Sequence, residues 1–226
     1  MKEKILKNKK IIDYLILIII GFILCIPLMN SSLDVYHDDG IQHISRAFGT
    51  LSSIKQNGFF PNVIIEFADN FGYSWNLFYG PLTTYGIIII NFISNNFIIA
   101  YKIFAFISLI LSGIFMYKFI NAYTKNNNVA LLASILYMTF PYHLTDLYTR
   151  NAIAEYASFM FIPLVFYGLY NLFYTSNKHY YLTIRSNRFD INTQYFNNAC
   201  CFFCTIIFRT KFWKDKAISY KKRINY

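Results

Sequence analysis

The sequence contains few charged residues. Only 14% of its 226 residues are Asp, Glu, Lys or Arg, whereas ordinary soluble domains carry roughly 25%. The segment Tyr14–Met29 has no charge over 16 positions, and a membrane-spanning helix needs about 20 mostly apolar residues. Because 56% of the chain is hydrophobic, its composition excludes an ordinary soluble protein and predicts an integral membrane protein.

The basic charge is concentrated at one end of the chain. The net charge is +10, but residues 185–226 hold nine Lys or Arg and two Asp, and the remaining 184 residues have a net charge of only +3. No compact stretch combines a basic face with stacking aromatics, the pattern expected of proteins that bind nucleic acid. We therefore expect the lipid bilayer as a partner, and no nucleic acid.

Cysteine is scarce, and its spacing favours neither a disulfide framework nor a metal site. Cys25 lies within an apolar run, where a free cysteine packs as a small hydrophobic residue. Cys200, Cys201 and Cys204 have no histidine nearby at a spacing typical of zinc ligands. No disulfide and no metal ligand is therefore assigned from the sequence.

Apolar runs predict four membrane spans and one segment with two interpretations. The expected spans are residues 11–29, 97–117, 129–144 and 153–174. Residues 80–94 contain a strongly apolar part of about 13 residues, a length that suits a re-entrant or interfacial helix as well as a span. Residues 30–76 form a long polar loop before this segment, and long loops of this kind tend to carry function.

The lysines predict how the chain is oriented in the membrane. The N-terminal "MKEKILKNKK" contains five lysines, and Lys or Arg near span ends favours the cytoplasmic side. If residues 80–94 enter the membrane without crossing it, the basic residues at 118–125 and 178–185 also face the cytoplasm. The loop 30–76 and the stretch 142–155 then lie together outside. We expect this multi-pass topology in the cell membrane, with a cytoplasmic N-terminus.

Residues 185–226 differ in character from the polytopic region 1–184. Their one apolar run, Ala199–Phe208, has ten residues and is too short to span a bilayer. Two interpretations stay open. The segment is a basic cytoplasmic tail, or it is translated in the wrong reading frame, in which case the native protein ends near Ile184.

Polar residues gather directly after the first expected span. This first group comprises His37, Asp38, Asp39, His43 and Arg46. On a helix, residues three or four positions apart share a face, so Asp39, His43 and Arg46 would form one polar stripe. Charges at a membrane margin are costly unless they are solvated or paired, which makes the stripe a candidate site. The alternative is a solvated loop with ordinary surface charges.

A second group lies in "DLYTRNAIAE" and comprises Asp146, Arg150 and Glu155. An arginine at this position is suited to bind a phosphate through two parallel hydrogen bonds. The structural alternative is equally simple. Asp146 and Arg150 are four positions apart and would pair on a helix, while Glu155 opens an apolar helix, whose N-terminus favours an acid.

The order of these motifs resembles a known type of bacterial membrane protein. The motifs are "DDGIQHISR", "NGFFPN", "GYSWNLFYGPL" and "LYTRNAIAE". Together they resemble GT-C-type polytopic glycosyltransferases, in particular the YfhO-like and 6-pyruvoyl-tetrahydropterin synthase-related membrane proteins, over about residues 10–180. The resemblance implies an all-α integral membrane fold. It would be a GT-C-like N-terminal helical bundle whose long first extracytoplasmic loop contains amphipathic or re-entrant helices.

The same resemblance implies a reaction and roles for particular residues. A sugar would pass from a polyprenyl-phosphate-linked donor to an extracytoplasmic acceptor. Asp39 would be the general base, with Asp38 as its alternate. The implied substrate-binding residues are His43, Arg46, Tyr79, Arg150 and Glu155. Some enzymes of this type use a divalent metal and others do not, so the cofactor stays open.

The chain has fewer spans than the enzymes it resembles. We therefore expect it to be the N-terminal part of such a transferase, or a truncated product without activity of its own. The alternative function is that of a non-catalytic polytopic membrane protein, either one that transports a lipid-linked substrate or a degenerate remnant.

Overall fold

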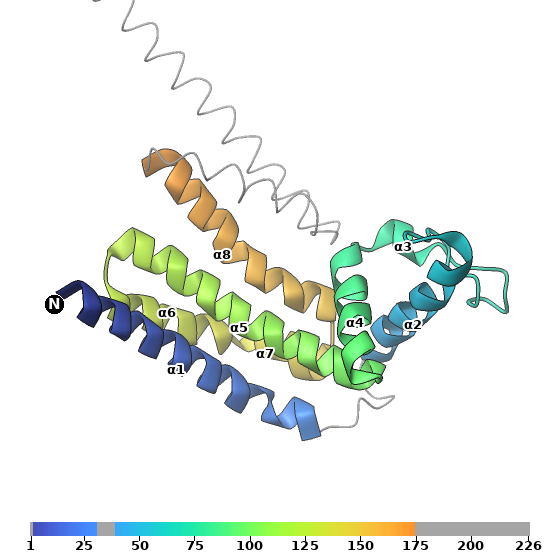
Figure 1. Ribbon diagram of the computed structural model, residues 1–226, viewed down its shortest axis with the longest axis horizontal. Coiled ribbons are helices and arrows are strands. Elements are labelled where there is room, and N and C mark those ends of the chain that lie inside the picture. Colours follow the sequence, from blue (N-terminus) through green and yellow to red (C-terminus); the bar gives the residue numbers. More distant parts are fainter. Residues whose placement is uncertain (1, 31–38, 175–226) are drawn as a thin grey trace, which may run out of the picture. The chain divides into compact units, whose positions relative to one another are not determined.

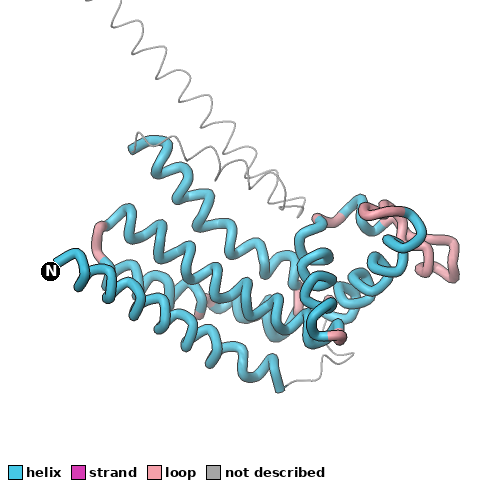
Figure 2. Tube along the Cα trace, in the orientation of Figure 1, coloured by secondary structure: helices cyan, strands magenta, loops and turns pink. Residues whose placement is uncertain are grey.

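The computed structural model describes residues 2–30 and 39–174, all within one compact unit, Met1–Asp190. Asp38 and the expected tail at 185–226 lie outside the described residues. The described residues form eight α-helices and one π-helix (Figures 1 and 2). These are α1 Lys2–Asn30, α2 Gly40–Asn57, α3 Trp75–Phe78, α4 Pro81–Ser94, α5 Phe97–Thr124, α6 Asn127–Met138, α7 Pro141–Thr145, η1 Asp146–Arg150 and α8 Ile153–Tyr174.

Three of the described helices are long and apolar enough to cross a membrane. They are the parts of α1, α5 and α8 at Lys9–Met29, Phe97–Thr124 and Ile153–Asn171. The exposed side of α1 is apolar along its length, with Ile11, Ile12, Leu15, Ile19, Phe22, Ile23 and Ile26. Such a surface suits hydrocarbon rather than water. The predicted all-α membrane fold is confirmed.

α5 is the central helix of the bundle and packs against α1, α4, α6 and α8 (Figure 1). Glycines permit its closest contacts. A Cβ at Gly113 of α5 would lie 2.4 Å from the sulfur of Met138, and one at Gly86 of α4 would lie 2.4 Å from the Phe104 ring. Because there is no room for a methyl group at these points, α4 and α6 approach α5 closely.

Asparagine side chains start α5 and α6. The side-chain oxygen of Asn96 accepts hydrogen bonds from two backbone N–H groups of the first turn of α5, at 2.9 and 3.1 Å. Asn126 does the same for α6, at 3.0 and 3.4 Å. The preceding residues, Asn95 and Lys125, are left-handed, with φ of 51° and 57°. A left-handed residue ends one helix and an asparagine cap begins the next, which makes both turns tight.

The segment expected to span at 129–144 is not one continuous helix. α6 ends at Met138, and α7 begins at Pro141. Proline disfavours the helical conformation in the residue before it, and Phe140 is extended, with φ of −58° and ψ of 130°. With 12 residues, α6 is about 18 Å long, shorter than a hydrocarbon core of about 30 Å. A crossing by this segment stays a prediction.

α4 runs across the end of the bundle rather than along it. In Figure 1 it lies crosswise to α5, at the end away from the N-terminus. Its 14 residues make it about 21 Å long. One side is buried, through Thr83, Thr84, Ile87 and Ile88. This placement holds α4 against the end of α5 and beside α2.

A buried acid in the first span fixes α1 against α5. Asp13 is only 4% exposed, and its carboxylate accepts a hydrogen bond of 2.6 Å from the hydroxyl of Tyr117. Tyr14 packs edge-on against the same tyrosine, with ring centroids 5.2 Å apart. Because a buried carboxylate needs a donor, this contact sets the rotation of α1 about its axis.

Pro163 interrupts the hydrogen bonding of α8, and α6 compensates. Proline has no N–H, so the carbonyl of Phe159, four residues earlier, loses its helical donor. The hydroxyl of Tyr137 donates to that carbonyl at 2.8 Å. This hydrogen bond connects the end of α6 to α8. It thereby holds α7 and η1, the elements between α6 and α8, at both ends.

Candidate functional site

The chain turns from α7 into α8 through a π-helix. η1 is followed by Asn151, which is left-handed with φ of 51° and whose N–H donates to the carbonyl of Asp146. A π-helix holds one more residue in each hydrogen-bonded turn than an α-helix, and such turns are frequent at functional sites. The wide turn sets the side chains of Asp146 and Arg150 next to each other.

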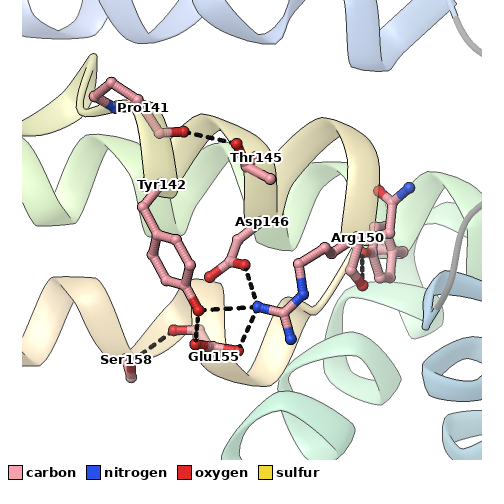
Figure 3. Close-up of polar contacts among 9 residues, drawn as sticks. Pro141, Tyr142, Thr145, Asp146, Arg150, Glu155 and Ser158 are labelled. Carbon is pink, nitrogen blue, oxygen red and sulfur yellow. Dashed lines mark hydrogen bonds and ion pairs between the residues drawn. The ribbon is translucent and has the colours of Figure 1, made fainter.

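Four side chains at this turn form the Arg150 cluster: Tyr142, Asp146, Arg150 and Glu155 (Figure 3). The Nη1 atom of Arg150 lies 2.8 Å from Asp146 Oδ1, 2.9 Å from Glu155 Oε2 and 3.0 Å from the Tyr142 hydroxyl. That hydroxyl also donates to Glu155. Nη1 carries only two hydrogens, so the three acceptor oxygens of Tyr142, Asp146 and Glu155 must share them. The predicted pair of Asp146 with Arg150 is confirmed, and Glu155 joins it.

The Arg150 cluster is buried on one side and open on the other. The Asp146 side chain is fully buried, at 0% exposed, whereas Arg150 and Glu155 are each 35% exposed. The second carboxylate oxygen of Asp146 has no hydrogen-bond partner in the described part of the chain. The hydrogen bonds that the Arg150 side chain donates there all use Nη1. Its Nε and Nη2 groups are therefore available to an anion on the open side.

Burial raises the pKa of the Asp146 carboxyl to about 6. The negative charge of Glu155 contributes to this rise, and the charge of Arg150 opposes it. A smaller contribution in the same direction comes from Asp39. Asp146 therefore changes its charge closer to neutral pH than an exposed aspartate does.

We expect Asp146→Asn to remove part of the pH dependence of stability. An aspartate has a pKa of about 3.9 in an unfolded chain, so the folded state binds the Asp146 proton more tightly. Wild-type protein should then lose stability as the pH rises from about 4 to about 6, and the variant should lose less. Thermal unfolding in detergent micelles across this range measures the difference. The exposed Asp69→Asn is the control, and equal slopes in wild type and Asp146→Asn would contradict the raised pKa.

A backbone hydrogen bond brings the start of α2 to the Arg150 cluster. The N–H of Asp39 donates to the carbonyl of Arg150 at 3.0 Å. A Cβ at the next residue, Gly40, would lie 3.1 Å from the Cβ of Asn151, so a glycine permits the approach. Asp39 is half-buried, and its side chain makes no capping bond to α2. Its carboxylate therefore lies near the cluster without being used by its own helix.

A second polar centre, the Arg46 cluster, comprises His43, Arg46, Asn76 and Tyr79. Arg46 is 1% exposed. Its Nε donates to the Asn76 side-chain oxygen at 3.0 Å, and its Nη2 donates to the Tyr79 carbonyl at 3.0 Å. The guanidinium also lies 5.0 Å from the centroid of the Tyr79 ring, and the His43 ring meets the same ring edge-on at 6.2 Å. Three of the predicted residues are thus in one place.

The described contacts of Arg46 go to the protein's own loop. Asn76 donates in turn to the Pro61 carbonyl at 2.9 Å, so Arg46 and Asn76 together hold the loop before α3 against α2. Burial lowers the pKa of Arg46 to about 10. The pKa of His43 is lowered to about 4, by burial and by the nearby charge of Arg46. At neutral pH the arginine is charged and the histidine is neutral. The buried Nη1 of Arg46 has no partner among the described residues.

α2 keeps the two clusters apart. Asp39 and Arg46 are seven positions apart, which corresponds to about 10 Å along a helix. Asp39 lies with Arg150 and Glu155, whereas His43 and Arg46 lie with Tyr79. The structure buries the two members of the predicted stripe that lie within α2. His43 is 7% exposed and Arg46 is 1% exposed.

Three polar residues in or next to these clusters were not predicted: Tyr142, Asn76 and Asn151. Asn151 had a sequence signal, because asparagine is enriched in left-handed positions. Its side chain is 1% exposed and has no hydrogen-bond partner within the described ranges. The roles of Tyr142 and Asn76 depend on contacts with distant residues, for which the local sequence carries no signal.

The described residues do not fit a metal centre. Within 2–30 and 39–174, no group of three or more His, Cys, Asp or Glu side chains is arranged to hold a metal ion. The carboxylates of Asp146 and Glu155 are both engaged by Arg150.

Fold and site define the chain as an all-α membrane protein with polar side chains gathered at one end of its bundle. Residues 77–187 match the model of a family described as "6-pyruvoyl-tetrahydropterin synthase related domain; membrane protein". A protein of Lactococcus lactis subsp. cremoris (strain MG1363), named "Uncharacterized protein", is 27% identical over 164 residues. The match covers 71% of this chain and 26% of the relative, so the chain spans about a quarter of its length. No solved structure matches the chain.

Proposed function

We propose that this chain is the N-terminal part of a membrane glycosyltransferase, which transfers a sugar from a polyprenyl-phosphate donor to an extracytoplasmic acceptor. The main support is the hydrogen bond of 3.0 Å between the Asp39 N–H and the Arg150 carbonyl. It brings Asp39, whose carboxylate makes no capping bond, to the turn that carries Arg150. A base next to a phosphate-binding cation suits transfer of a group from a phosphate.

In this reaction Asp39 removes the proton of the acceptor hydroxyl while the hydroxyl oxygen attacks the anomeric carbon of the sugar. The bond between that carbon and the phosphate oxygen breaks, and its electron pair leaves with the polyprenyl phosphate. The N–H groups of Arg150 stabilise the charge that develops on this phosphate. Glu155 orients the guanidinium. Asp38, next to Asp39 in the chain, is the alternate base.

The charge balance of the Arg150 cluster bears on the binding of a phosphate. Arg150 faces the two carboxylates of Asp146 and Glu155, and a phosphate would add further negative charge. The pKa of Asp146 is raised to about 6, and uptake of one proton by this carboxyl would leave Arg150 with a single charged carboxylate. The remaining predicted residues, His43, Arg46 and Tyr79, would shape the substrate side of α2.

An apolar groove between α1 and α5 suits the lipid part of such a donor. It has a volume of about 280 Å³ and is lined by Phe22, Cys25, Ile26, Met29 and Phe106. Tyr148, within the same π-helix as Arg150, donates a hydrogen bond to the carbonyl of Leu24 in α1. The groove and the Arg150 cluster therefore lie on neighbouring elements, one fit for an isoprenoid segment and the other for a phosphate.

The predicted topology puts this site outside the cytoplasm. If the lysines fix the N-terminus inside, the start of α2 lies outside. The stretch 142–155 lies on the same side only when residues 80–94 do not cross. The bond between Asp39 and Arg150 joins these two regions, and α4 lies crosswise to α5 (Figure 1). Both observations support the placement of these two regions on one side of the membrane.

We expect Asp39→Asn to abolish sugar transfer in a full-length relative that carries the same Asp-x-x-x-His-x-x-Arg motif. Loss of a general base typically lowers the rate by about 10²–10⁴-fold, while binding of the lipid donor should persist. The assay follows transfer of labelled sugar from a polyprenyl-phosphate donor in membranes, with the exposed Asp69→Asn as the control. Unchanged transfer would contradict the proposal. Donor binding without any transfer by the wild type would favour the alternative, a carrier of lipid-linked substrate.

A further inference from the structure

α4 is apolar on two opposite sides, but only one side has a partner among the described residues. The buried side faces α2 and α5. The other side carries Ile89, Phe92 and Ile93, whose exposed fractions are 62%, 67% and 84%. Residues three and four positions apart share a helix face, so these three form one continuous surface, which we call the α4 ridge.

Aromatic residues extend the α4 ridge beyond its N-terminal end. Tyr85 precedes Ile89 by one turn and donates a hydrogen bond of 2.6 Å to the Phe59 carbonyl. The rings of Phe59 and Phe60 each lie 5.6 Å from the Tyr85 ring. Both phenylalanines are strongly exposed, at 64% and 71%. The loop after α2 therefore adds to the apolar surface of α4.

The segment that contains α4 lacks charge. No Asp, Glu, Lys or Arg occurs in the 32 residues between Asp69 and Lys102. Protein surfaces that face water are rich in these residues, and interfaces with protein partners usually have a polar rim. A charge-free apolar surface of this extent is typical of contact with lipid.

The α4 ridge continues onto a helix that is long enough to span the membrane. Two residues in the first turn of α5, Ile98 and Ile99, are 42% and 46% exposed. They follow Phe92 and Ile93 after the short turn between the helices. Because α5 is long and apolar enough to cross a bilayer, its exposed apolar surface faces lipid, and the α4 ridge extends that surface at the end of the bundle.

We propose that the α4 ridge lies in the bilayer, at the boundary between headgroups and acyl chains of the leaflet at this end. A crosswise helix can pack one side on the bundle and bury the other side in lipid. The residues just before α4, Tyr79 and Gly80, are the carbonyl acceptors of Arg46. The ridge thereby holds the Arg46 cluster, and with it α2, at a fixed depth beside the membrane.

The test uses tryptophan fluorescence of the full 226-residue chain in phosphatidylcholine vesicles. The two native tryptophans are replaced by phenylalanine (Trp75→Phe, Trp213→Phe), and Phe92→Trp reports on the ridge. We expect phospholipids with brominated acyl chains to quench most of its emission and aqueous iodide to quench little. Zwitterionic vesicles should suffice, because the ridge has no charge. Ile93→Trp is a second reporter.

Phe71→Trp is the matched control in the same background. Phe71 is 92% exposed in the loop between α2 and α3, which lies farther from the bundle than α4 in Figure 1. Iodide should quench this reporter, and brominated lipids should not. Iodide quenching of the tryptophans at 92 and 93 would overturn the proposal. Protection of these tryptophans from both quenchers would also overturn it, because protein rather than lipid would then cover the ridge. Equal lipid quenching at 71 and 92 would also overturn the assignment to the ridge.

Discussion

Arg150→Met is expected to lower the free energy of unfolding by about 3–5 kcal/mol, because it leaves a buried carboxylate without its partner. Asp146 is 0% exposed, and among the described residues it forms an ion pair with Arg150 alone. The pair with Glu155 contributes less, since both side chains are 35% exposed and solvent screens them. Unfolding in micelles with increasing amounts of SDS gives the change in free energy.

Two further variants separate charge from packing at Arg150. In Arg150→Met with Asp146→Asn, both members of the buried pair are neutral, and most of the lost stability should return. Arg150→Lys keeps the charge but loses the planar fork of donors, so an intermediate loss is expected. If the double variant is as unstable as Arg150→Met, the effect comes from the methylene stem of Arg150 rather than from its charge.

Arg46→Met is expected to loosen the loop between α2 and α4. It removes the donors to the Asn76 side chain and to the carbonyls of Tyr79 and Gly80. A hydrogen bond from a charged donor contributes about 1.5–3 kcal/mol, and the acceptors left behind are partly buried. The loss is local, because the loop contacts the bundle through α2 and α4. Faster proteolysis within residues 58–80 of the folded protein measures it.

Arg46→Lys is the informative comparison for that loop. A lysine keeps the charge but reaches one acceptor where the guanidinium reaches three, so proteolysis should be intermediate. Ile41→Met, at a 40% exposed position on the same helix, is the control and should leave the rate unchanged. If Arg46→Met matches or exceeds the stability of the wild type, the cost of burying the cation outweighs its hydrogen bonds.

Hydrophobic pattern alone was enough to predict most of the helical fold. The apolar runs at 11–29, 97–117 and 153–174 all lie within helices of the structure. A run of apolar residues indicates burial in lipid or protein, and this signal does not depend on which other segments pack against it. The stretch 129–144 shows the limit of this signal, because hydropathy averages over Pro141, whereas the backbone breaks there.

The sequence predicted which residues belong to the candidate site, but it predicted only some of the contacts between them. The pairing of Asp146 with Arg150 follows from a spacing of four positions on a helical turn. The contact of Tyr79 with Arg46 spans 33 positions, and no local pattern predicts such a contact. Tyr142 and Asn76 were missed for the same reason, since each acts through a partner that folding brings to it.

The sequence by itself determined that this is an all-α membrane protein with two groups of charged residues next to apolar helices. These features depend on composition and local spacing, which folding does not alter. Only the tertiary structure decided that Asp39 lies at Arg150, that Arg46 is buried against the loop before α4, and that α4 runs across the end of the bundle. Each depends on a contact between segments far apart in the chain, where backbone groups and close packing, rather than residue type, set the geometry.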